Sequence, residues 1–379
     1  MERISTLVMQ GVTREFAGTT VLHHIDLTIG GGSFVTLLGP SGCGKTTALN
    51  CLAGLLELSG GAILVNGRPI QNLPPEKRNF GMVFQNYALF PHLTVARNVS
   101  YGLEVRGVNR AERDRRVARA LEMVHLEAFG KRYPAQLSGG QQQRLAIART
   151  IVLEPQLLLL DEPLSNLDTN LRNEMRIEIK RIHTQLNLTT VYVTHDQSEA
   201  LSLSDQIVVM KLGNIEQVGT PQEIYDHPKS LYVANFMGYA NQLRGTITGH
   251  DGQQWLVRTT GGAELRATAT DAISAGWGNG QGVILASKPT ETLSGEPGMV
   301  NGMTGQPMLA EYMGNSFEVL VLTPEGQMLV HMPSAPAATS TVTFGIRPER
   351  LLAFADDAAA RDLPTPSLNG TATPIAAGR

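Results

Sequence analysis

A glycine-rich segment directly after the apolar run from Phe34 to Leu38 has the composition of a phosphate-binding loop. Its residues are Gly39, Pro40, Ser41, Gly42, Cys43, Gly44, Lys45 and Thr46, and Thr47 opens a helix-prone stretch. Glycines let the backbone curl until its N–H groups point inward, and the helix start adds its positive end. The pattern predicts that this loop binds ATP, with Lys45 at the β- and γ-phosphates and the Thr46 hydroxyl on Mg²⁺. A chance glycine turn is the alternative, and the flanking strand and helix argue against it.

Two adjacent carboxylates end a second apolar run. Asp161 and Glu162 follow the four leucines from Leu157 to Leu160. Successive side chains alternate sides of a strand, so the two can take different roles. We expect Asp161 to hold Mg²⁺ and Glu162 to polarise the attacking water. An acid after an apolar run is more often a plain strand end, but the upstream phosphate loop favours the catalytic interpretation.

A third segment, Leu137 to Gln141, reads Leu-Ser-Gly-Gly-Gln and precedes a helix-patterned stretch. Its hydroxyl, bare N–H groups and helix start offer a second phosphate cradle. The segment resembles the signature motif of ABC ATPases. This resemblance implies that Ser138, Gly139, Gly140 and Gln141 of one subunit cover the nucleotide held by the phosphate loop of a second copy. A plain helix cap is the structural alternative.

Further motifs of that family occur in the expected order. Gln85 resembles the Q-loop glutamine, which would sense Mg²⁺ and the transport partner, and Asp168 resembles the D-loop aspartate at the dimer seam. His195 resembles the switch histidine that contacts the γ-phosphate. Phe16 stands where the family places an aromatic residue on adenine, and stacking of this kind is tolerant of sequence. Ala17 follows Phe16 where relatives usually have glycine, which indicates a different backbone path.

The elements that must position these residues change character near Met237 to Asn241. Before this point, apolar runs alternate with helix-patterned stretches, which predicts an α/β fold of parallel strands and crossover helices. After it, short runs separated by turns predict a small antiparallel β barrel. We therefore expect four parts: a P-loop NTPase core over residues 1–238, a helical subdomain over about 87–150 within it, an all-β domain over 239–354, and a disordered tail over 355–379.

Composition narrows the class of protein. The net charge of −3 gives no basic field for nucleic acid, and no apolar window is long enough for a membrane helix. We expect a chain at the cytoplasmic face of the inner membrane, held there by protein partners. The two cysteines, Cys43 and Cys51, fit a reducing compartment, and the proximity of Lys45 predicts that Cys43 favours the thiolate.

The flanking sequences resemble those of importer ATPases. The stretch from Arg78 to Val95 and that from Leu203 to Tyr232 carry this resemblance, and the C-terminal region is similar to an OB-like transport-associated domain. The resemblance implies an ATPase that energises two membrane permease subunits and, through them, a substrate-binding protein. Within importers, the segment from Phe80 to Pro91 is closest to the polyamine, ferric-ion and organophosphonate branch, and polyamine is our first expectation. A sugar importer, a non-transport ABC ATPase and a regulatory subunit are the alternatives, although a regulatory subunit should lack Glu162 or His195.

Overall fold

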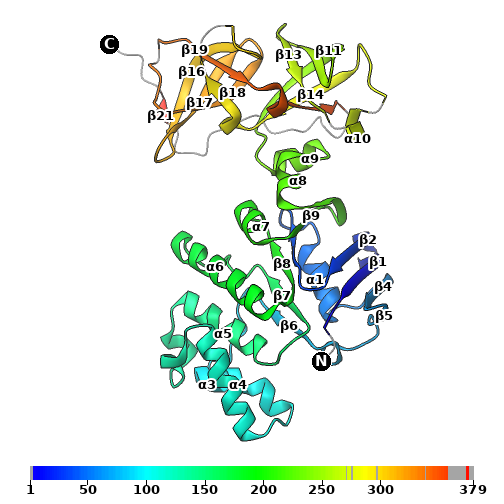
Figure 1. Cartoon of the computed structure of the whole chain (residues 1–379), viewed down its shortest axis with the longest axis vertical. Coiled ribbons are helices and arrows are strands. Elements are labelled where there is room, and N and C mark those ends of the chain that lie inside the picture. Colours follow the sequence, from blue (N-terminus) through cyan, green and yellow to red (C-terminus); the bar gives the residue numbers. More distant parts are fainter. Residues whose placement is uncertain are drawn as a thin grey trace. The chain divides into compact units, whose positions relative to one another are not determined.

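The computed structural model describes residues 3–269, 271–274, 276–295, 298–337, 339–356 and 373–374. The chain divides into two compact units, Met1–Ile224 and Tyr225–Arg379 (Figure 1). The sequence predicts a domain boundary at 238/239, which would put α9 (Leu231–Phe236) in the first domain. In the structure, α9 lies in the second compact unit. In the described residues, no helix combines the length and apolar character needed to cross a bilayer.

A six-stranded sheet is the centre of the first unit. Its strands are β3 (Phe34–Leu38), β6 (Phe80–Val83), β7 (Leu157–Asp161), β8 (Thr189–Thr194), β9 (Gln206–Lys211) and β10 (Asn214–Gly219). They lie in the order β10-β9-β3-β8-β7-β6, and all pairs are parallel except β10 with β9. The leucine and valine runs recognised in the sequence form β3, β7 and β8. Because parallel strands share one direction, the residues after β3, β6, β7 and β8 meet at one edge.

The two faces of this sheet belong to different apolar cores. Val35, Leu37 and Leu159 pack into a core with α1 (Lys45–Ala53) and with a second, antiparallel sheet. That sheet has the order β2-β1-β4-β5, from β1 (Thr6–Phe16), β2 (Thr19–Gly30), β4 (Gly60–Val65) and β5 (Arg68–Pro69). Leu158 and Leu160 pack on the opposite face against helices. The alternation of a strand thus separates α1 from the helical layer.

The helical layer contains three helices from the segment predicted to be a helical subdomain. They are α3 (Val95–Val105), α4 (Arg110–Met123) and α5 (Gly139–Ile151), with the short 3₁₀ turns η1 (Glu127–Phe129) and η2 (Pro134–Gln136) between them. Thr94, Asn109 and Ser138 cap their first turns with side-chain oxygens. The remaining helices of this unit are α2 (Pro75–Arg78), α6 (Thr169–Leu186), α7 (Gln197–Leu203) and α8 (Pro221–Asp226), whose last residues pass into the second unit.

The second unit is rich in β structure. One antiparallel sheet has the order β13-β12-β11-β14-β20, and a second, curled sheet contains β15-β19-β16-β17-β18, with β21 paired to β16. The bounds are β11 (Asn241–Asp251), β12 (Gln254–Thr259), β13 (Glu264–Ala267), β14 (Gly282–Ser287), β15 (Thr292–Ser294), β16 (Met303–Tyr312), β17 (Phe317–Thr323), β18 (Gly326–Met332), β19 (Val342–Ile346), β20 (Leu352–Ala355) and β21 (Thr373–Pro374). The short helices are α9, α10 (Asp271–Ser274), η3 (Pro289–Glu291) and η4 (Pro348–Arg350). Both sheets share one core that includes Val257, Val319 and Phe344.

The tail predicted to be disordered over residues 355–379 falls mostly outside the described residues. Within it, Ala355 ends β20, and Thr373–Pro374 forms the short strand β21 on β16.

Candidate functional site

The phosphate loop joins the end of β3 to the start of α1. Gly42 and Gly44 have φ values of 81° and 104°, a region that L side chains rarely adopt, so both positions favour glycine. Gly44 is the N-cap of α1, and the loop therefore leads into a helix start with free N–H groups. The whole segment Gly39 to Thr47 has the strand, turn and helix context that a phosphate cradle requires.

Lys45 is buried beneath the loop. Its Nζ donates to the carbonyl oxygens of Gly39 and Pro40, at 2.7 and 2.8 Å. These contacts place the ammonium group inside the curl of the loop. Cys43 lies 4.0 Å from the same Nζ, but burial raises the pKa of its thiol and outweighs the charge of Lys45. The expectation of a thiolate at Cys43 is therefore wrong, since the side chain is only 2% exposed.

Thr46 and Asp161 meet at the same edge of the sheet. The Thr46 hydroxyl donates to Asp161 Oδ1 at 3.0 Å, although 115 residues separate them in the chain. Burial raises the pKa of Asp161, and the hydrogen bond from Thr46 opposes this shift. Two hard oxygen donors side by side suit Mg²⁺, which keeps several water or phosphate ligands of its own. The residues present thus fit the ion that the sequence predicts.

Glu162 and His195 come together from β7 and β8. His195 Nδ1 lies 3.3 Å from Glu162 Oε2. Glu162 has a φ of 41°, an uncommon value for a residue with a side chain, and such values cluster at functional sites. The chain therefore turns sharply after Asp161, and the two carboxylates point in different directions. Asp161 pairs with Thr46, and Glu162 pairs with His195.

Gln85 joins this group from the loop after β6. Its Nε2 donates to Ser165 Oγ at 3.3 Å, and Ser165 Oγ donates to the carbonyl oxygen of Glu162 at 2.9 Å. Asn166 Nδ2 donates to the Gln85 carbonyl oxygen at 3.0 Å. One connected group of residues therefore lies at the carboxyl edge of the sheet. It contains the phosphate loop, Gln85, Asp161, Glu162 and His195.

The signature segment lies apart from that group, at the start of α5. Ser138 and Gln141 form a capping box, in which Ser138 N donates to Gln141 Oε1 at 3.0 Å. A side-chain carbon at Gly140 would lie 2.6 Å from Leu171. Within the described part of the chain, no hydrogen bond or ion pair joins Ser138 or Gln141 to the phosphate loop. Asp168 is the N-cap of α6, where its Oδ1 accepts from the N–H groups of Asn170 and Leu171.

Comparison with known proteins identifies the family of this chain. The family profile described as ABC transporter matches residues 22–165, the span from β2 to just after Glu162, which includes the phosphate loop. The chain is 43% identical over 338 residues to the Fe(3+) ions import ATP-binding protein FbpC 1 of Rhizobium meliloti, covering 89% of this chain and 94% of that relative. The chain belongs to the ATP-binding subunits of ABC importers.

Two further relatives define how far the similarity reaches. The spermidine/putrescine import ATP-binding protein PotA of Oleidesulfovibrio alaskensis is 56% identical over 240 residues, which cover 63% of this chain and 64% of PotA. The solved structure of CbiO1 from Clostridium perfringens, part of the ABC transporter complex CbiONQ, matches with a TM-score of 0.56 and 30% identity, covering 60% of this chain and 92% of that one. The chain is thus an ABC transport ATPase with a β-rich C-terminal region.

Sequence reasoning missed the residues that hold the His195 loop of this ABC ATPase. Glu199 is buried, and its Oε2 accepts from Tyr192 OH and Thr194 Oγ1, both at 2.7 Å. Burial raises the pKa of the Glu199 carboxyl. Asp196 caps α7 by accepting from the N–H groups of Ser198 and Glu199. The signal in the sequence was a tyrosine and three threonines inside the buried strand β8.

Phe16 ends β1 on the two-residue turn Ala17-Gly18. Both turn residues have positive φ, 47° and 84°, as in a type I′ hairpin. Ala17 therefore adopts a conformation that favours glycine, and the backbone path is that of a two-residue hairpin turn. The Phe16 ring is 39% exposed and carries the guanidinium of Arg14 at 4.4 Å from its centroid. The ring is thus accessible for stacking, with one face shared by Arg14.

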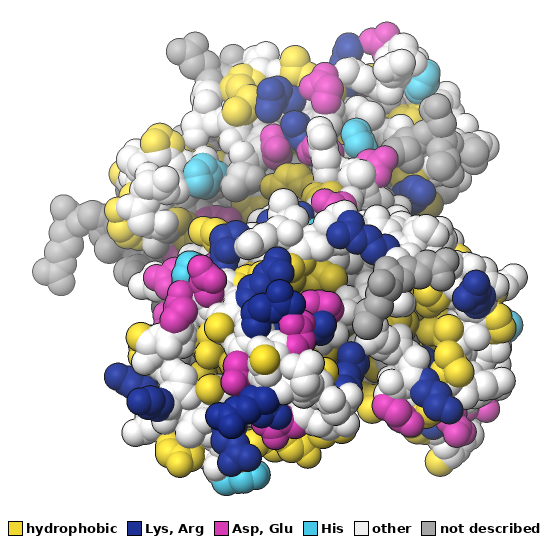
Figure 2. Space-filling model, turned by 60° about the horizontal axis from the view of Figure 1, so that its bottom comes forward, with side chains coloured by type: hydrophobic (Ala, Val, Ile, Leu, Met, Phe, Trp, Pro, Cys, Tyr) yellow, Lys and Arg dark blue, Asp and Glu magenta, His cyan; other side chains and the backbone are white. Residues whose placement is uncertain are grey.

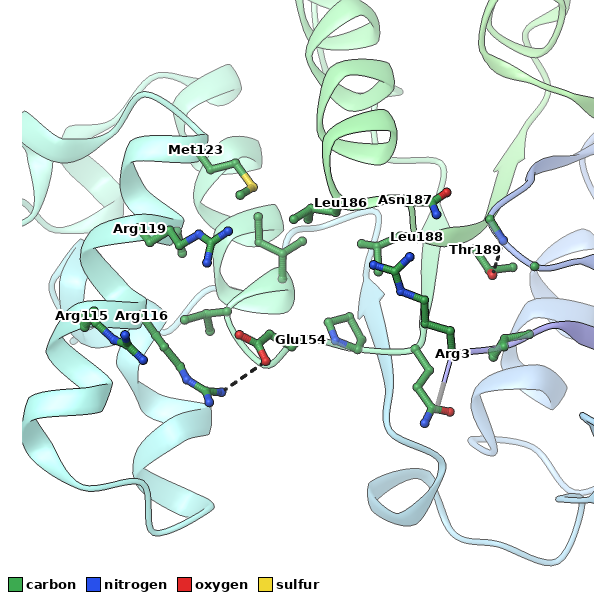
Figure 3. A pocket seen from close by; sticks show the side chains of 18 of the residues that line it. Arg3, Arg115, Arg116, Arg119, Met123, Glu154, Leu186, Asn187, Leu188 and Thr189 are labelled. Atoms are coloured by element: carbon green, nitrogen blue, oxygen red, sulfur yellow. Dashed lines mark hydrogen bonds and ion pairs between the residues drawn. The ribbon is translucent and has the colours of Figure 1, made fainter. Parts of the chain in front are cut away.

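A cavity of about 750 Å³ lies at the amino ends of the same parallel strands, between them and α4. Apolar residues line it, among them Ile4, Met123 and Leu188. Arginine side chains extend toward it from α4 and from Arg3 (Figure 3). Arg116 pairs with Glu154, but Arg3 and Arg119 point inward from opposite walls (Figure 3). Across the described residues, neither of these two guanidinium groups has a hydrogen-bond or ion-pair partner. Basic and acidic side chains otherwise mix over the face shown in Figure 2.

Proposed function

We propose that two copies of this chain enclose two ATP molecules, each bound by the phosphate loop of one copy and the signature segment of the other. The observation that carries this proposal is that the central sheet lies between Ser138 and the phosphate loop. α1 packs on one face of the sheet and α5 on the other. Both segments are built to receive phosphate, since each has free N–H groups at a helix start. A second copy supplies what one copy lacks.

Within each composite site, the side chains divide the work of hydrolysis. Lys45 neutralises phosphate charge, and Thr46 with Asp161 would hold Mg²⁺, whose charge stabilises the phosphate oxygens when it is bound. Glu162 accepts a hydrogen bond from the attacking water and polarises it, while His195, 3.3 Å away, keeps that carboxylate in position and reaches the γ-phosphate. Gln85 joins the Mg²⁺ side of the site to Ser165. Phe16 stacks on the adenine base.

A complementation experiment tests the composite site. Ser138→Arg should leave ATP binding intact and abolish hydrolysis, because Lys45 and Thr46 are unchanged while the partner's site loses its cover. Lys45→Ala should lose binding. Mixed together, the two inactive variants should regain activity, because one of the two sites in a mixed dimer is intact. If Ser138→Arg lost binding and turnover equally, or if the mixture stayed inactive, the composite site would be wrong.

As part of an importer, this chain would bind a pair of membrane permease subunits at the cytoplasmic face of the membrane. We place one contact of the permease at the cavity of Figure 3, at the opposite ends of the strands from the phosphate loop, in addition to the contact that the Q-loop resemblance of Gln85 implies. Its apolar lining residues suit a permease segment with apolar and acidic side chains, as do the guanidinium groups of Arg3 and Arg119, which have no partner within the described residues. A substrate-binding protein would then act through the permease and not through this chain.

The transported solute is proposed to be a polyamine. The relative named for spermidine and putrescine import supports this choice at 56% identity over 240 residues, whereas the relative named for ferric ions covers more of the chain at lower identity. Uptake of labelled spermidine and of ferric ion, in cells with and without this gene, distinguishes the two. Loss of ferric-ion uptake with normal spermidine uptake would reject the polyamine and keep the transport ATPase.

A further inference from the structure

The loop after β6 contains two consecutive residues in a conformation that L residues avoid. Tyr87 and Ala88 have φ values of 62° and 46°. The Cβ atom comes too close to the following carbonyl oxygen in this region, so the loop needs outside contacts to hold it. Tyr87 adds a second anomaly, because its side chain is buried and its hydroxyl has no hydrogen-bond partner in the described residues. The loop is therefore held against its local preference.

Arg149, near the end of α5, makes the contacts that hold it. One guanidinium nitrogen donates to the Ala88 carbonyl oxygen at 2.6 Å, and the other donates to that of Tyr87 at 3.1 Å. The guanidinium also lies over the Phe90 ring, 5.3 Å from its centroid. A planar fork with two parallel donors matches two neighbouring carbonyls, and a lysine ammonium does not.

The two ends of this contact lead to different parts of the site. Gln85 is two residues before Tyr87 and is bonded to Ser165 and Asn166, and Ser165 is bonded to the Glu162 carbonyl. In the other direction, α5 begins at Gly139, immediately after the Ser138 cap. A single helix therefore carries the signature segment at its start and the guanidinium that grips the loop near its end.

We propose that Arg149 is a positioning residue that fixes the Tyr87–Ala88 loop to α5, so that the position of the signature helix sets the position of Gln85 and Glu162 in the same subunit. This inference rests on the proposed function and adds an internal connection between the two halves of the composite site. Arg149 touches no reacting atom. It acts through the loop, and its loss should therefore affect turnover more than nucleotide binding.

The test compares steady-state ATPase kinetics of the full chain with those of five variants, at a temperature where circular dichroism shows all of them folded. Arg149→Gln should lower kcat about tenfold, as expected for lost charge-assisted hydrogen bonds, and leave KM for ATP within about twofold. Arg149→Lys should recover only part of kcat. Arg132→Gln is the matched control, because Arg132 also lies over a phenylalanine ring, that of Phe129, and no side-chain hydrogen bond joins it to residues 84–90 within the described part of the chain. Its kcat should be that of the unmodified chain.

A second-site change separates positioning from general stabilisation. Glycine adopts positive φ without strain, so Ala88→Gly should reduce the dependence of the loop on Arg149. The double variant Ala88→Gly/Arg149→Gln should have a kcat within about threefold of Ala88→Gly alone. Amide hydrogen exchange in Arg149→Gln should rise over residues 84–90 and also over 162–166, whereas a local packing role would raise it only near the loop.

The outcomes distinguish this inference from the function on which it rests. If the unmodified chain failed to hydrolyse ATP, the proposed function itself would be contradicted. If the unmodified chain were active and Arg149→Gln kept its kcat, only the role of Arg149 would be overturned. A double variant as slow as Arg149→Gln, with exchange unchanged at 162–166, would overturn it too.

Discussion

Asp161 and Glu162 are neighbours in the chain, but their carboxylates have different surroundings. Asp161 accepts from Thr46 and is buried, whereas Glu162 faces His195 after a turn through positive φ. The alternation of side chains along a strand predicts that the two point apart, and the turn through Glu162 explains how the second reaches the histidine. At the scale of the residue, the two acids can therefore be tested separately.

Glu162→Gln keeps the shape of the side chain and removes the charge that, in the proposed mechanism, polarises water. Turnover should fall by at least about 100-fold, the typical effect of removing a positioned general base. In the proposed dimer, hydrolysis separates the two copies, so the variant should accumulate with ATP as a dimer in size-exclusion chromatography. Asp161→Asn is the matched control: it weakens the Mg²⁺ site and should give no such dimer. Near-normal turnover in Glu162→Gln would move the catalytic role to another residue, with His195 the first to examine.

At the scale of the element, the strands that carry the chemistry could be read from the sequence because they are buried on both faces. Strands made almost only of apolar residues are stable only in the centre of a sheet that is covered on both faces. The four leucines before Asp161 and the run from Phe34 to Leu38 are such strands. The phosphate loop and the carboxylates follow from those strands. Their meeting at one edge requires only that the strands be parallel.

Other elements could not be read in this way. The bounds of β11 and β14 could not be predicted, since glycine, threonine and asparagine interrupt β11, and the two strands pair with each other about 40 residues apart in the chain. Glu199 and Arg149 were also missed, because a buried acid and a loop-gripping arginine are recognised only by what they touch. Cys43 was misjudged because proximity to Lys45 can be read from sequence and burial cannot.

The helix α4 offers a test of the permease contact. Arg119→Glu reverses a charge that points into the cavity and has no partner among the described residues, so an acidic permease segment would be repelled. We expect the variant to co-purify with its permease complex in detergent at about tenfold lower yield. Arg110→Glu is the matched control, since that side chain is on the same helix, 88% exposed and not part of the cavity. Equal yields for Arg119→Glu and the unmodified chain would remove the cavity from the permease contact.

At the scale of the whole molecule, the second unit contains a buried lysine that ties its first segment to its sheets. Lys288, at the end of β14, donates to the Tyr225 carbonyl oxygen at 3.0 Å and lies against the rings of Tyr225 and Tyr239. Asp226 and Glu291 favour its charged form, but burial outweighs them and lowers the pKa of Lys288 to about 7. Asp226 is itself paired with Arg350, at 2.8 Å.

The stability of the second unit should therefore rise with pH. In the unfolded chain, a lysine has a pKa of about 10.4, so between about pH 7 and pH 10 the unfolded state binds more protons than the folded state. The cost of burying the ammonium is complete below about pH 7 and fades as pH increases. Both tryptophans, Trp255 and Trp277, lie in this unit, and their fluorescence reports its unfolding. The urea midpoint should increase from pH 7 to pH 9 in the unmodified chain and in the exposed-lysine control Lys229→Met, and should increase less in Lys288→Met, where no amine titrates. The same increase in Lys288→Met would show that another group sets the pH dependence.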